Sequence, residues 1–262
     1  MQGLLEKVRS GILGKMTNGM LGRMERGLLD VVFPAKCAGC GEEGYYICRR
    51  CEGFVGEVAL ICPLCQQSSL TGERHENCRS LYGFAGLASI WEYEGVVKNL
   101  LHNIKYNGMT HAVAKTVQNA YINMAEDAMR FKPFLSCLFS KDTCITYVPM
   151  FKRKEKFRGF NQAAVFAKEM GKAVGKGVVS LLEKIIDTKS QTDLGKKERL
   201  ENVKDSFAVS DAGGTLSVPS TTLSVVLVDD VWTTGATMKE CCKILRKAGA
   251  QEVWGFTVAR TP

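Results

Sequence analysis

The chain has 262 residues, 45% of them hydrophobic, and a formal net charge of +8 at pH 7. This length suits one large domain, or one medium domain with an appendage. No apolar run is long enough to span a membrane, and the N-terminus lacks an apolar segment with a small-residue cleavage site. These features argue against membrane insertion and secretion and predict a cytoplasmic protein. The positive charge favours an anionic ligand, nucleic acid among them.

Residues 1–29 form a basic extension in which apolar residues recur at nearly helical spacing. Leu5 and Val8 begin this stripe, and Lys7 stands between them. A basic amphipathic helix of this kind can lie on a membrane surface, bind a partner or pack on its own protein. Interspersed glycines weaken the helix, and the pattern does not choose between these roles.

Residues 30–82 contain a regular series of metal-ligand pairs. Three CxxC pairs and one His-x2-Cys pair supply eight candidate ligands, the number that two tetrahedral zinc sites require. In a reducing compartment, this regularity favours zinc over disulfides. Protein side chains fill every position, so we predict structural rather than catalytic zinc. The candidate ligands are Cys37, Cys40, Cys48, Cys51, Cys62, Cys65, His75 and Cys78.

The spacing does not decide which of these pairs share an ion. Sequential pairing would place the first two CxxC pairs on one ion and the last two pairs on the other. His75 is the weakest candidate, because a lone histidine in a polar loop is usually solvated. The remaining cysteines lie in apolar or helical surroundings and are expected to be small core residues: Cys137, Cys144, Cys241 and Cys242.

From residue 83 onward, predicted strands alternate with predicted helices. The expected strands are 87–93, 143–149, 178–186, 225–228 and 252–260, and the expected helices are 95–107, 111–130, 161–174 and 238–248. This alternation predicts an α/β fold with a doubly wound, mostly parallel sheet. The polar stretch 188–204 is expected to be a mobile lid, and 211–222 a surface connection.

The most informative segment is the buried strand at 225–228 together with the residues that follow it. Asp229 and Asp230 come directly after the strand, and a hydroxyl-rich turn leads from them into a helix. Ligands of open α/β sheets bind at the carboxyl ends of strands, and such a turn offers backbone N–H groups to a phosphate. The segment predicts a site for a phosphorylated sugar; the alternative is an acidic loop and a threonine N-cap. The turn comprises Thr233, Thr234, Gly235, Ala236 and Thr237.

A basic loop, residues 151–160, follows the strand at 143–149 and holds five cations against one acid. It can bind pyrophosphate, follow a nucleic-acid backbone or be a solvated run of charge. Its position after a strand favours the first interpretation, because two anion sites at one sheet edge fit a ligand phosphorylated at both ends. The candidates are Lys152, Arg153, Lys156 and Arg158, with Arg158 favoured for its forked guanidinium.

Several motifs together resemble the ComF family over residues 28–262. They are FPAKCAGC, the CxxC pairs, Lys105-Tyr106, YVPMFKRKEKFRGFNQA, QTDLGKKERLENVKDSF and VLVDDVWTTGAT. ComF-like proteins couple an N-terminal zinc-ribbon segment to a type I phosphoribosyltransferase domain, and members are associated with DNA uptake in natural competence. The resemblance implies a double zinc ribbon at 30–82 and a phosphoribosyltransferase domain at 83–262. The chain departs from many relatives at 150–152, where Met-Phe-Lys replaces a Leu-His-Pro run.

The resemblance also implies roles for the site residues. Asp229 and Asp230 would hold the ribose hydroxyls of phosphoribosyl pyrophosphate (PRPP), residues 233–237 would cradle its 5′-phosphate, and residues 150–158 would meet the pyrophosphate together with Mg²⁺. Residues 191–202 would be the hood loop that closes over the site. Asp229, Asp230 and Arg158 are then the catalytic candidates, and positioning and electrostatics would drive transfer without a protein nucleophile.

Two functions are compatible with these motifs. The first is transfer of a phosphoribosyl group to an acceptor that the sequence does not identify. The second is non-catalytic binding of single-stranded DNA beside the competence helicase machinery, with the PRPP site retained. A homodimer is a further expectation.

Overall fold

The computed structural model describes residues 35–78, 80–110, 112–188, 196–210 and 224–262. The basic extension at 1–29 and the connection at 211–222 lie outside the described residues, as does much of the hood segment. The predictions made for them therefore remain predictions. None of the helices in the described ranges has both the length and the apolar character needed to cross a membrane.

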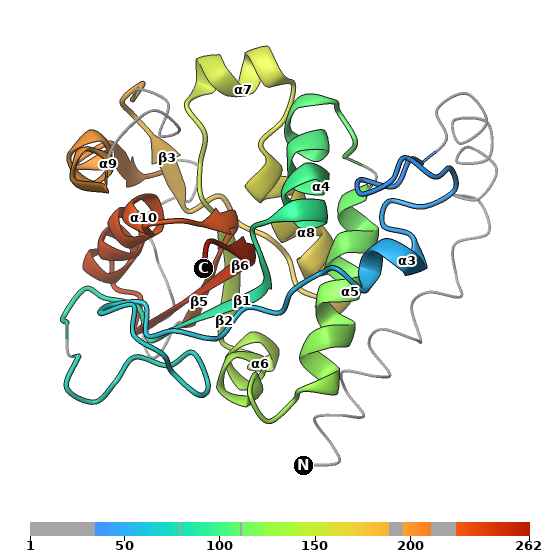
Figure 1. The fold of residues 1–262 in the computed structure, drawn as a ribbon. Helices are drawn as coiled ribbons and strands as arrows, with labels where there is room; N and C mark the ends of the chain where they lie inside the picture. The colour runs from blue at the N-terminus through green and yellow to red at the C-terminus, as the bar shows by residue number, and fades with distance from the viewer. Residues whose placement is uncertain (1–34, 79, 111, 189–195, 211–223) are drawn as a thin grey trace.

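A parallel sheet forms the centre of the molecule (Figure 1). Among the described residues it has four strands in the order β1-β6-β5-β2, and every pairing between neighbours is parallel. The strands are β1 (Gly86–Glu92), β2 (Thr143–Tyr147), β5 (Ser224–Trp232) and β6 (Glu252–Arg260). Val225, Val226, Leu227 and Val228 of the inner strand β5 are all fully buried, which confirms that this run is covered on both faces.

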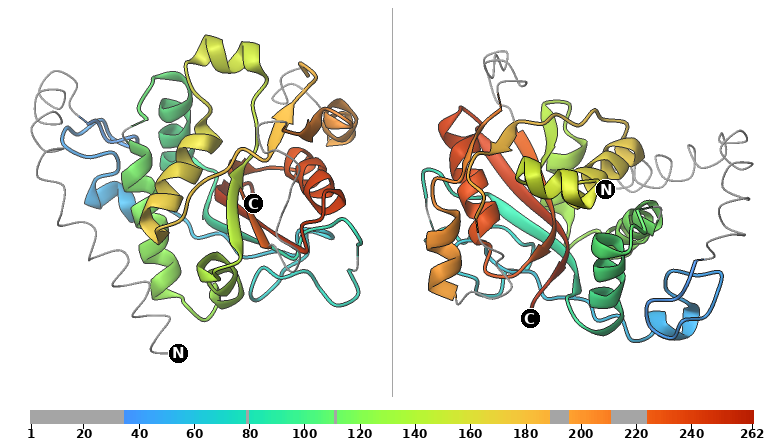
Figure 2. Two further views of the ribbon diagram at one scale, coloured as in Figure 1. Left: turned by 180° about the vertical axis from the view of Figure 1, so that it is seen from behind. Right: turned by 90° about the horizontal axis from the view of Figure 1, so that it is seen from above.

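Helices cover both faces of this sheet, as the two further views show (Figure 2). On one face, α4 (Gly95–Tyr106), α5 (Ala112–Glu126), α6 (Lys132–Phe139) and α8 (Gln162–Val174) pack around Phe134, Phe166 and Phe256. On the other face, α10 (Ala236–Lys247) packs around Trp232 and Phe84. The predicted doubly wound parallel sheet is confirmed.

The predicted basic loop at 151–160 is wrong in its secondary structure. Residues Lys152–Arg158 form a short helix, α7, which projects from the carboxyl edge of the sheet (Figure 1). Lysine, arginine and glutamate are good helix formers, and Gly159 ends the helix in the left-handed conformation with φ 88°. The loop was predicted from the high density of charged residues, but a high density of charge does not by itself exclude a helix.

The predicted strand at 178–186 is also largely wrong. Only Leu182–Lys184 is a strand, β3, and it pairs antiparallel with β4 (Phe207–Val209) in a separate two-stranded sheet. Val178 makes a single parallel bridge to Ile145 before the chain leaves the central sheet. The apolar pattern is real, because Leu181 and Leu182 are buried, but they pack under α10 rather than inside the main sheet.

The end of the polar stretch contains a helix, α9 (Lys196–Val203), and the mobility of 188–204 stays a prediction. The sequence pattern does not predict α6 or β4. Proline at its second position marks the beginning of α6, after the long predicted helix at 111–130 has already ended at Glu126.

The cysteine segment runs along the outer side of β1. Isolated antiparallel bridges join Glu57 to Trp91 and Glu73 to Gly86. These pairings cover the free edge of the sheet, which would otherwise expose unpaired backbone groups. The loop between the two bridges carries Cys62 and Cys65 of the second predicted zinc-ligand set, and His75 and Cys78 follow the second bridge.

Candidate functional site

The predicted acid pair, phosphate turn and basic segment all lie at the carboxyl edge of the sheet. The strand β5 continues to Trp232, so Asp229 and Asp230 lie within its last four residues rather than in a loop after it. Helix α4 follows β1, α7 follows β2 and α10 follows β5. Because parallel strands end at the same edge, these connections bring separate parts of the chain together there.

Asp230 is the centre of a polar network on one face of β5. It is 7% exposed, and the Lys105 Nζ atom of α4 lies 3.4 Å from its Oδ2 atom. The Gln162 Nε2 group donates to the same oxygen at 3.5 Å, and Arg158 Nη1 donates to Gln162 Oε1 at 2.7 Å. The predicted acid and the predicted arginine are thus connected through an amide that the sequence did not single out.

Asp229 points to the opposite side of the strand, as successive strand residues do. The backbone N–H of Asp230 donates to the Oδ1 atom of Asp229 at 2.9 Å. On that side, burial together with the Asp229 charge raises the pKa of the Cys241 thiol of α10. The two adjacent acids therefore lie in different surroundings, which the sequence alone could not distinguish.

The charges in this network shift one another. Asp230 raises the pKa of Lys105, against the opposing effect of burial, so this lysine is a cation at neutral pH. Burial and the neighbouring Asp230 carboxylate raise the pKa of Asp229 well above its usual value. Asp230 pairs with the Lys105 ammonium group, whereas burial and the neighbouring Asp230 charge make ionisation of Asp229 unfavourable.

We expect Asp229→Asn to raise the thermal midpoint of unfolding at pH 7. The folded-state pKa of Asp229 lies well above the ordinary value of an aspartate, so its ionisation works against folding at every pH above that ordinary value. Each kcal/mol gained corresponds to about 2–4 °C in a chain of this size. Thermal unfolding at pH 7 and near pH 3.5 measures this, and the gain should nearly vanish at the lower pH, where the carboxyl is protonated in the folded state and mostly protonated in the unfolded state.

The matched control is Asp230→Asn, which removes the partner of Lys105 and should lower the midpoint at pH 7. A lower midpoint for Asp229→Asn than for the wild type at pH 7 would contradict the assignment of unfavourable charge to Asp229.

The predicted phosphate turn opens α10 beside this network. Gly235 is its N-cap with φ 71°, and a Cβ atom there would lie 2.1 Å from the Trp232 ring. The position therefore requires glycine both for its conformation and for its space. The Ala236 N–H donates to Thr234 Oγ1 at 3.3 Å, and the twelve-residue helix α10 places its positive dipole end at this turn. This geometry suits an anion.

The cations of α7 separate into three groups. Arg158 belongs to the Asp230 network, and its guanidinium lies 5.3 Å from the centre of the Tyr106 ring. Arg153 pairs with Asp187, whose pKa is lowered chiefly by the hydrogen bond from Lys154. The predicted candidates Lys152 and Lys156 are exposed on α7, and so is Phe157, which follows Lys156 and is 95% exposed.

Two functional residues were missing from the predicted set. Lys105 stands in the Lys105-Tyr106 pair that the family resemblance includes, so a signal for it was present in the sequence. Gln162 opens α8 directly after its cap, Asn161, whose side chain accepts from the Ala163 N–H. Gln162 stands in the motif YVPMFKRKEKFRGFNQA that the family resemblance includes, but its local pattern is that of an ordinary first-turn glutamine.

The first zinc-ligand set gathers Cys37, Cys40, Cys48 and Cys51, whose sulfur atoms all lie within 4.8 Å of one another. The Cys48 N–H donates to the Cys37 sulfur at 3.3 Å. Burial opposes a thiolate at Cys37, but the N–H groups of Cys48, Cys40 and Gly39 outweigh it and lower its pKa to about 6. Burial and the other sulfurs raise the pKa of Cys51 to about 12. Four sulfurs this close ionise together only beside a cation, so the set fits zinc.

The second set gathers Cys62, Cys65, His75 and Cys78 within the same limit. His75 Nδ1 lies 3.4 Å from the Cys65 sulfur, while His75 Nε2 lies 3.0 Å from the Ser68 carbonyl oxygen. A histidine that binds zinc through one ring nitrogen typically donates from the other to such an oxygen. The structure therefore supports His75 as a ligand and groups the pairs sequentially, which the spacing alone left open.

The cysteines outside these sets behave as predicted. Cys137, Cys241 and Cys242 are buried, and Cys144 is partly buried. Burial raises the pKa of Cys137 to about 11 and also raises those of the other three, so all four stay protonated.

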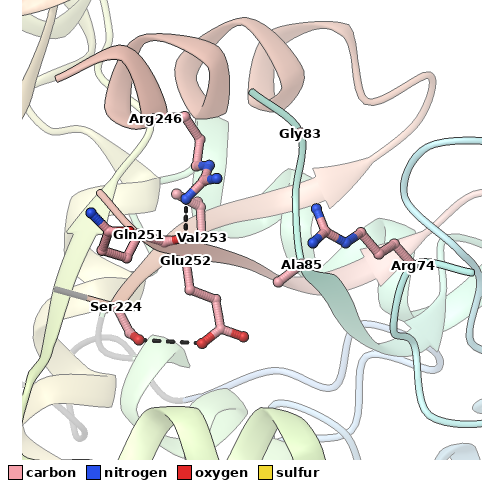
Figure 3. A pocket seen from close by; sticks show the side chains of 8 residues that line it. All are labelled: Arg74, Gly83, Ala85, Ser224, Arg246, Gln251, Glu252 and Val253. Atoms are coloured by element: carbon pink, nitrogen blue, oxygen red, sulfur yellow. Dashed lines mark hydrogen bonds between the residues drawn. The ribbon is translucent and has the colours of Figure 1, made fainter. Parts of the chain in front are cut away.

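A pocket at the opposite edge of the sheet, where the strands begin, is built from groups that satisfy one another (Figure 3). Glu252 accepts from Ser224 Oγ at 3.3 Å and from Trp254 Nε1 at 2.9 Å. Arg246 Nη1 donates to the carbonyl oxygens of Ala250 and Gln251. These interactions fasten the beginning of β6 to the end of α10, so the pocket has a structural explanation.

The family described as the phosphoribosyl transferase domain matches residues 161–262, which include α8, β5, α10 and β6. Competence protein F of Haemophilus influenzae is 31% identical over 115 residues, 43% of this chain and 48% of that protein. DNA utilization protein YhgH of Salmonella typhi is 26% identical over 226 residues, 86% of this chain and 88% of that protein.

Competence protein ComFC of Bacillus subtilis is 24% identical over 229 residues, 82% of this chain and 84% of that protein. The chain is therefore a homologue of the ComF, ComFC and YhgH proteins, with a phosphoribosyl transferase domain and a cysteine-rich segment before it. The resemblance that the sequence motifs indicate is confirmed.

Proposed function

We propose that the protein binds PRPP at the carboxyl edge of the sheet and transfers its phosphoribosyl group to an acceptor. The observation that carries this proposal is the Asp230 network beside the turn that opens α10. A ribose phosphorylated at both ends needs hydroxyl acceptors between two anion sites. The turn at Gly235, the acid at Asp230 and the cation at Arg158 offer these three functions along one edge.

In this proposal, Asp229 and Asp230 accept hydrogen bonds from the ribose hydroxyls, and the turn from Thr233 to Thr237 takes the 5′-phosphate. Lys105 pairs with Asp230, Arg158 is linked to Asp230 through Gln162, and the exposed lysines of α7 extend the positive charge outward. Mg²⁺, when bound with PRPP, would neutralise part of the pyrophosphate charge. Residues 83–262 would form the transferase domain and 30–82 a double zinc ribbon.

The chemistry is a displacement at C1 of the ribose. The bond from C1 to the pyrophosphate oxygen breaks, pyrophosphate leaves with the electron pair, and a nucleophilic atom of the acceptor bonds to C1. The cationic character of C1 in the transition state requires neither a protein nucleophile nor a redox step. The residues act by holding both ends of the donor and by stabilising the leaving charge.

Titration calorimetry with PRPP and Mg²⁺ tests the proposal. We expect saturable binding at one site per chain, which weakens when Mg²⁺ is omitted. Ribose 5-phosphate should compete, because it carries the group assigned to the turn. Absence of PRPP binding to the zinc-loaded protein would overturn the proposal.

A second candidate function, binding of single-stranded DNA, is favoured by one specific observation. Phe157 is 95% exposed on α7 between cations, and an exposed ring among positive charges is the usual platform on which a base stacks. The names of the relatives, competence proteins and DNA utilization proteins, agree with a role in handling DNA. The two functions are compatible, because Lys152, Lys156 and Phe157 are exposed on α7, whereas Arg158 of the same helix belongs to the Asp230 network.

Charge reversal on α7 should abolish most of any affinity for single-stranded DNA. We expect Lys152→Glu/Lys156→Glu to weaken oligonucleotide binding at least about tenfold at low salt and to flatten its salt dependence. Phe157→Ala should weaken binding by a similar factor with the salt dependence preserved. Fluorescence anisotropy at several salt concentrations measures both, with Lys115→Glu/Lys132→Glu on α5 and α6 as the matched control. Equal losses in the α7 and control variants would place the DNA site elsewhere.

A further inference from the structure

The second zinc-ligand set contacts the proposed phosphate turn directly. Gln66 follows the ligand Cys65, and its Nε2 group donates to the Thr234 carbonyl oxygen at 3.3 Å, across 168 positions of sequence. The contact is partly buried. It joins the module that would hold zinc to the peptide unit that precedes Gly235.

The shape of the zinc-ligand turn determines where Gln66 points. Its backbone N–H donates to the Cys62 carbonyl at 2.8 Å, and its φ of 65° is in the left-handed region that non-glycine residues rarely adopt. This conformation is maintained by the turn from Cys62 to Cys65, so the reach of the side chain depends on the ligand geometry of that turn.

The module is also fastened to the transferase domain on both sides of this turn. The Val58 N–H donates to Ile90 O at 3.3 Å before it, and the Leu87 N–H donates to Gly72 O at 2.8 Å after it. A Cβ atom at Gly72 would lie 2.3 Å from the Leu87 oxygen, so the two backbones approach as closely as glycine allows. Gln66 therefore extends from an anchored loop.

The hydrogen bond orients the amide that the turn would present to a phosphate. The chain has no cis peptide bond among its described residues, so the Thr234 C=O and the Gly235 N–H lie on opposite sides of one planar unit. Holding the carbonyl toward Gln66 directs the Gly235 N–H away from the zinc module. Glycine at 235 tolerates several orientations of this unit, so an external contact is needed to select one.

We propose that Gln66 is a positioning residue that couples the second zinc module to phosphate affinity, by holding the Thr234–Gly235 peptide in its binding orientation. This inference rests on the proposed function for its ligand, PRPP. The zinc held by Cys62, Cys65, His75 and Cys78 would set the turn, the turn would place Gln66, and Gln66 would orient the amide.

The test compares Gln66→Ala and Gln66→Glu with the neighbouring control Gln67→Ala in the full-length, zinc-loaded protein. Gln66→Glu keeps the size of the side chain and removes the N–H donor. We expect both Gln66 variants to retain two zinc ions per chain and to bind PRPP and ribose 5-phosphate about three- to tenfold more weakly. Binding of Mg²⁺-pyrophosphate should stay unchanged, whereas a general structural defect would weaken it as well. Gln67→Ala should behave as the wild type.

A second readout is hydrogen exchange, followed by mass spectrometry, in the segment 232–238 without ligand. We expect faster exchange there in the Gln66 variants than in Gln67→Ala. Wild-type affinity for ribose 5-phosphate in both Gln66 variants, or unchanged exchange in this segment, would overturn the inference. If the wild type itself binds no PRPP, the proposed function fails, and the exchange rates decide separately whether Gln66 orders the turn.

Discussion

Asp230→Ala is expected to reduce PRPP affinity by at least about 100-fold, because hydrogen bonds to a charged acceptor contribute about 1.5–3 kcal/mol each and a ribose offers two hydroxyls. The substitution also leaves Lys105 without its ion-pair partner and Gln162 without its acceptor. Calorimetry with PRPP and Mg²⁺ measures the loss. Asp230→Asn keeps the shape of the side chain and should give an intermediate affinity.

The matched control for this experiment is Asp142→Asn, which alters an exposed carboxyl next to the beginning of β2, at the opposite edge of the sheet. This control should bind PRPP as the wild type does. Affinity of Asp230→Ala within about threefold of the control would contradict the placement of the ribose on Asp230, since that difference is smaller than one ordinary hydrogen bond to a charged group.

Loss of one zinc ligand should be the most destabilising single change in the described part of the chain. Structural zinc supplies an apparent 10–16 kcal/mol or so in small zinc-binding units, comparable to the whole stability of a typical domain. We expect Cys37→Ser and Cys62→Ser each to reduce the zinc content from two ions per chain to one. Each should lower the thermal midpoint by roughly 10 °C or more.

The control is Cys242→Ala, a fully buried cysteine outside both ligand sets. It removes core volume and should lower the midpoint modestly while both zinc ions remain bound. Zinc analysis of the purified variants separates the two cases. Full zinc content in Cys37→Ser or Cys62→Ser would show that the corresponding set is not a tetrahedral site.

The zinc predictions also connect each module to a different part of the donor site. The first set packs against Val96 of α4, and Asn99 of the same helix donates to Ala38 O at 3.1 Å. Because α4 also carries Lys105, the first module supports the helix that pairs with Asp230. The second set reaches the turn of α10 through Gln66. Zinc loss at either module should therefore weaken PRPP binding as well as stability.

Local sequence patterns were sufficient to predict those features that depend on interactions between residues close in the chain. The run at 225–228 is apolar on both faces, so it could only be an inner strand, and the glycine and threonines after it could be read as a turn into a helix. The CxxC spacing likewise predicts its ligands, because metal geometry requires them in close pairs. By contrast, the charge-rich residues 152–158 could be read as a loop, since helix propensity and charge density suggest different structures there.

Periodicity and spacing act over a few residues, so sequence patterns alone predict the parallel α/β architecture, the eight candidate zinc ligands and the acid pair before a phosphate-type turn. Only the tertiary structure decided which acid meets Lys105, how Gln162 links Arg158 to Asp230, and which cysteine pairs share a site. It also decided that Gln66 contacts Thr234. These relations join residues from different elements, and their distances depend on how the helices and strands pack.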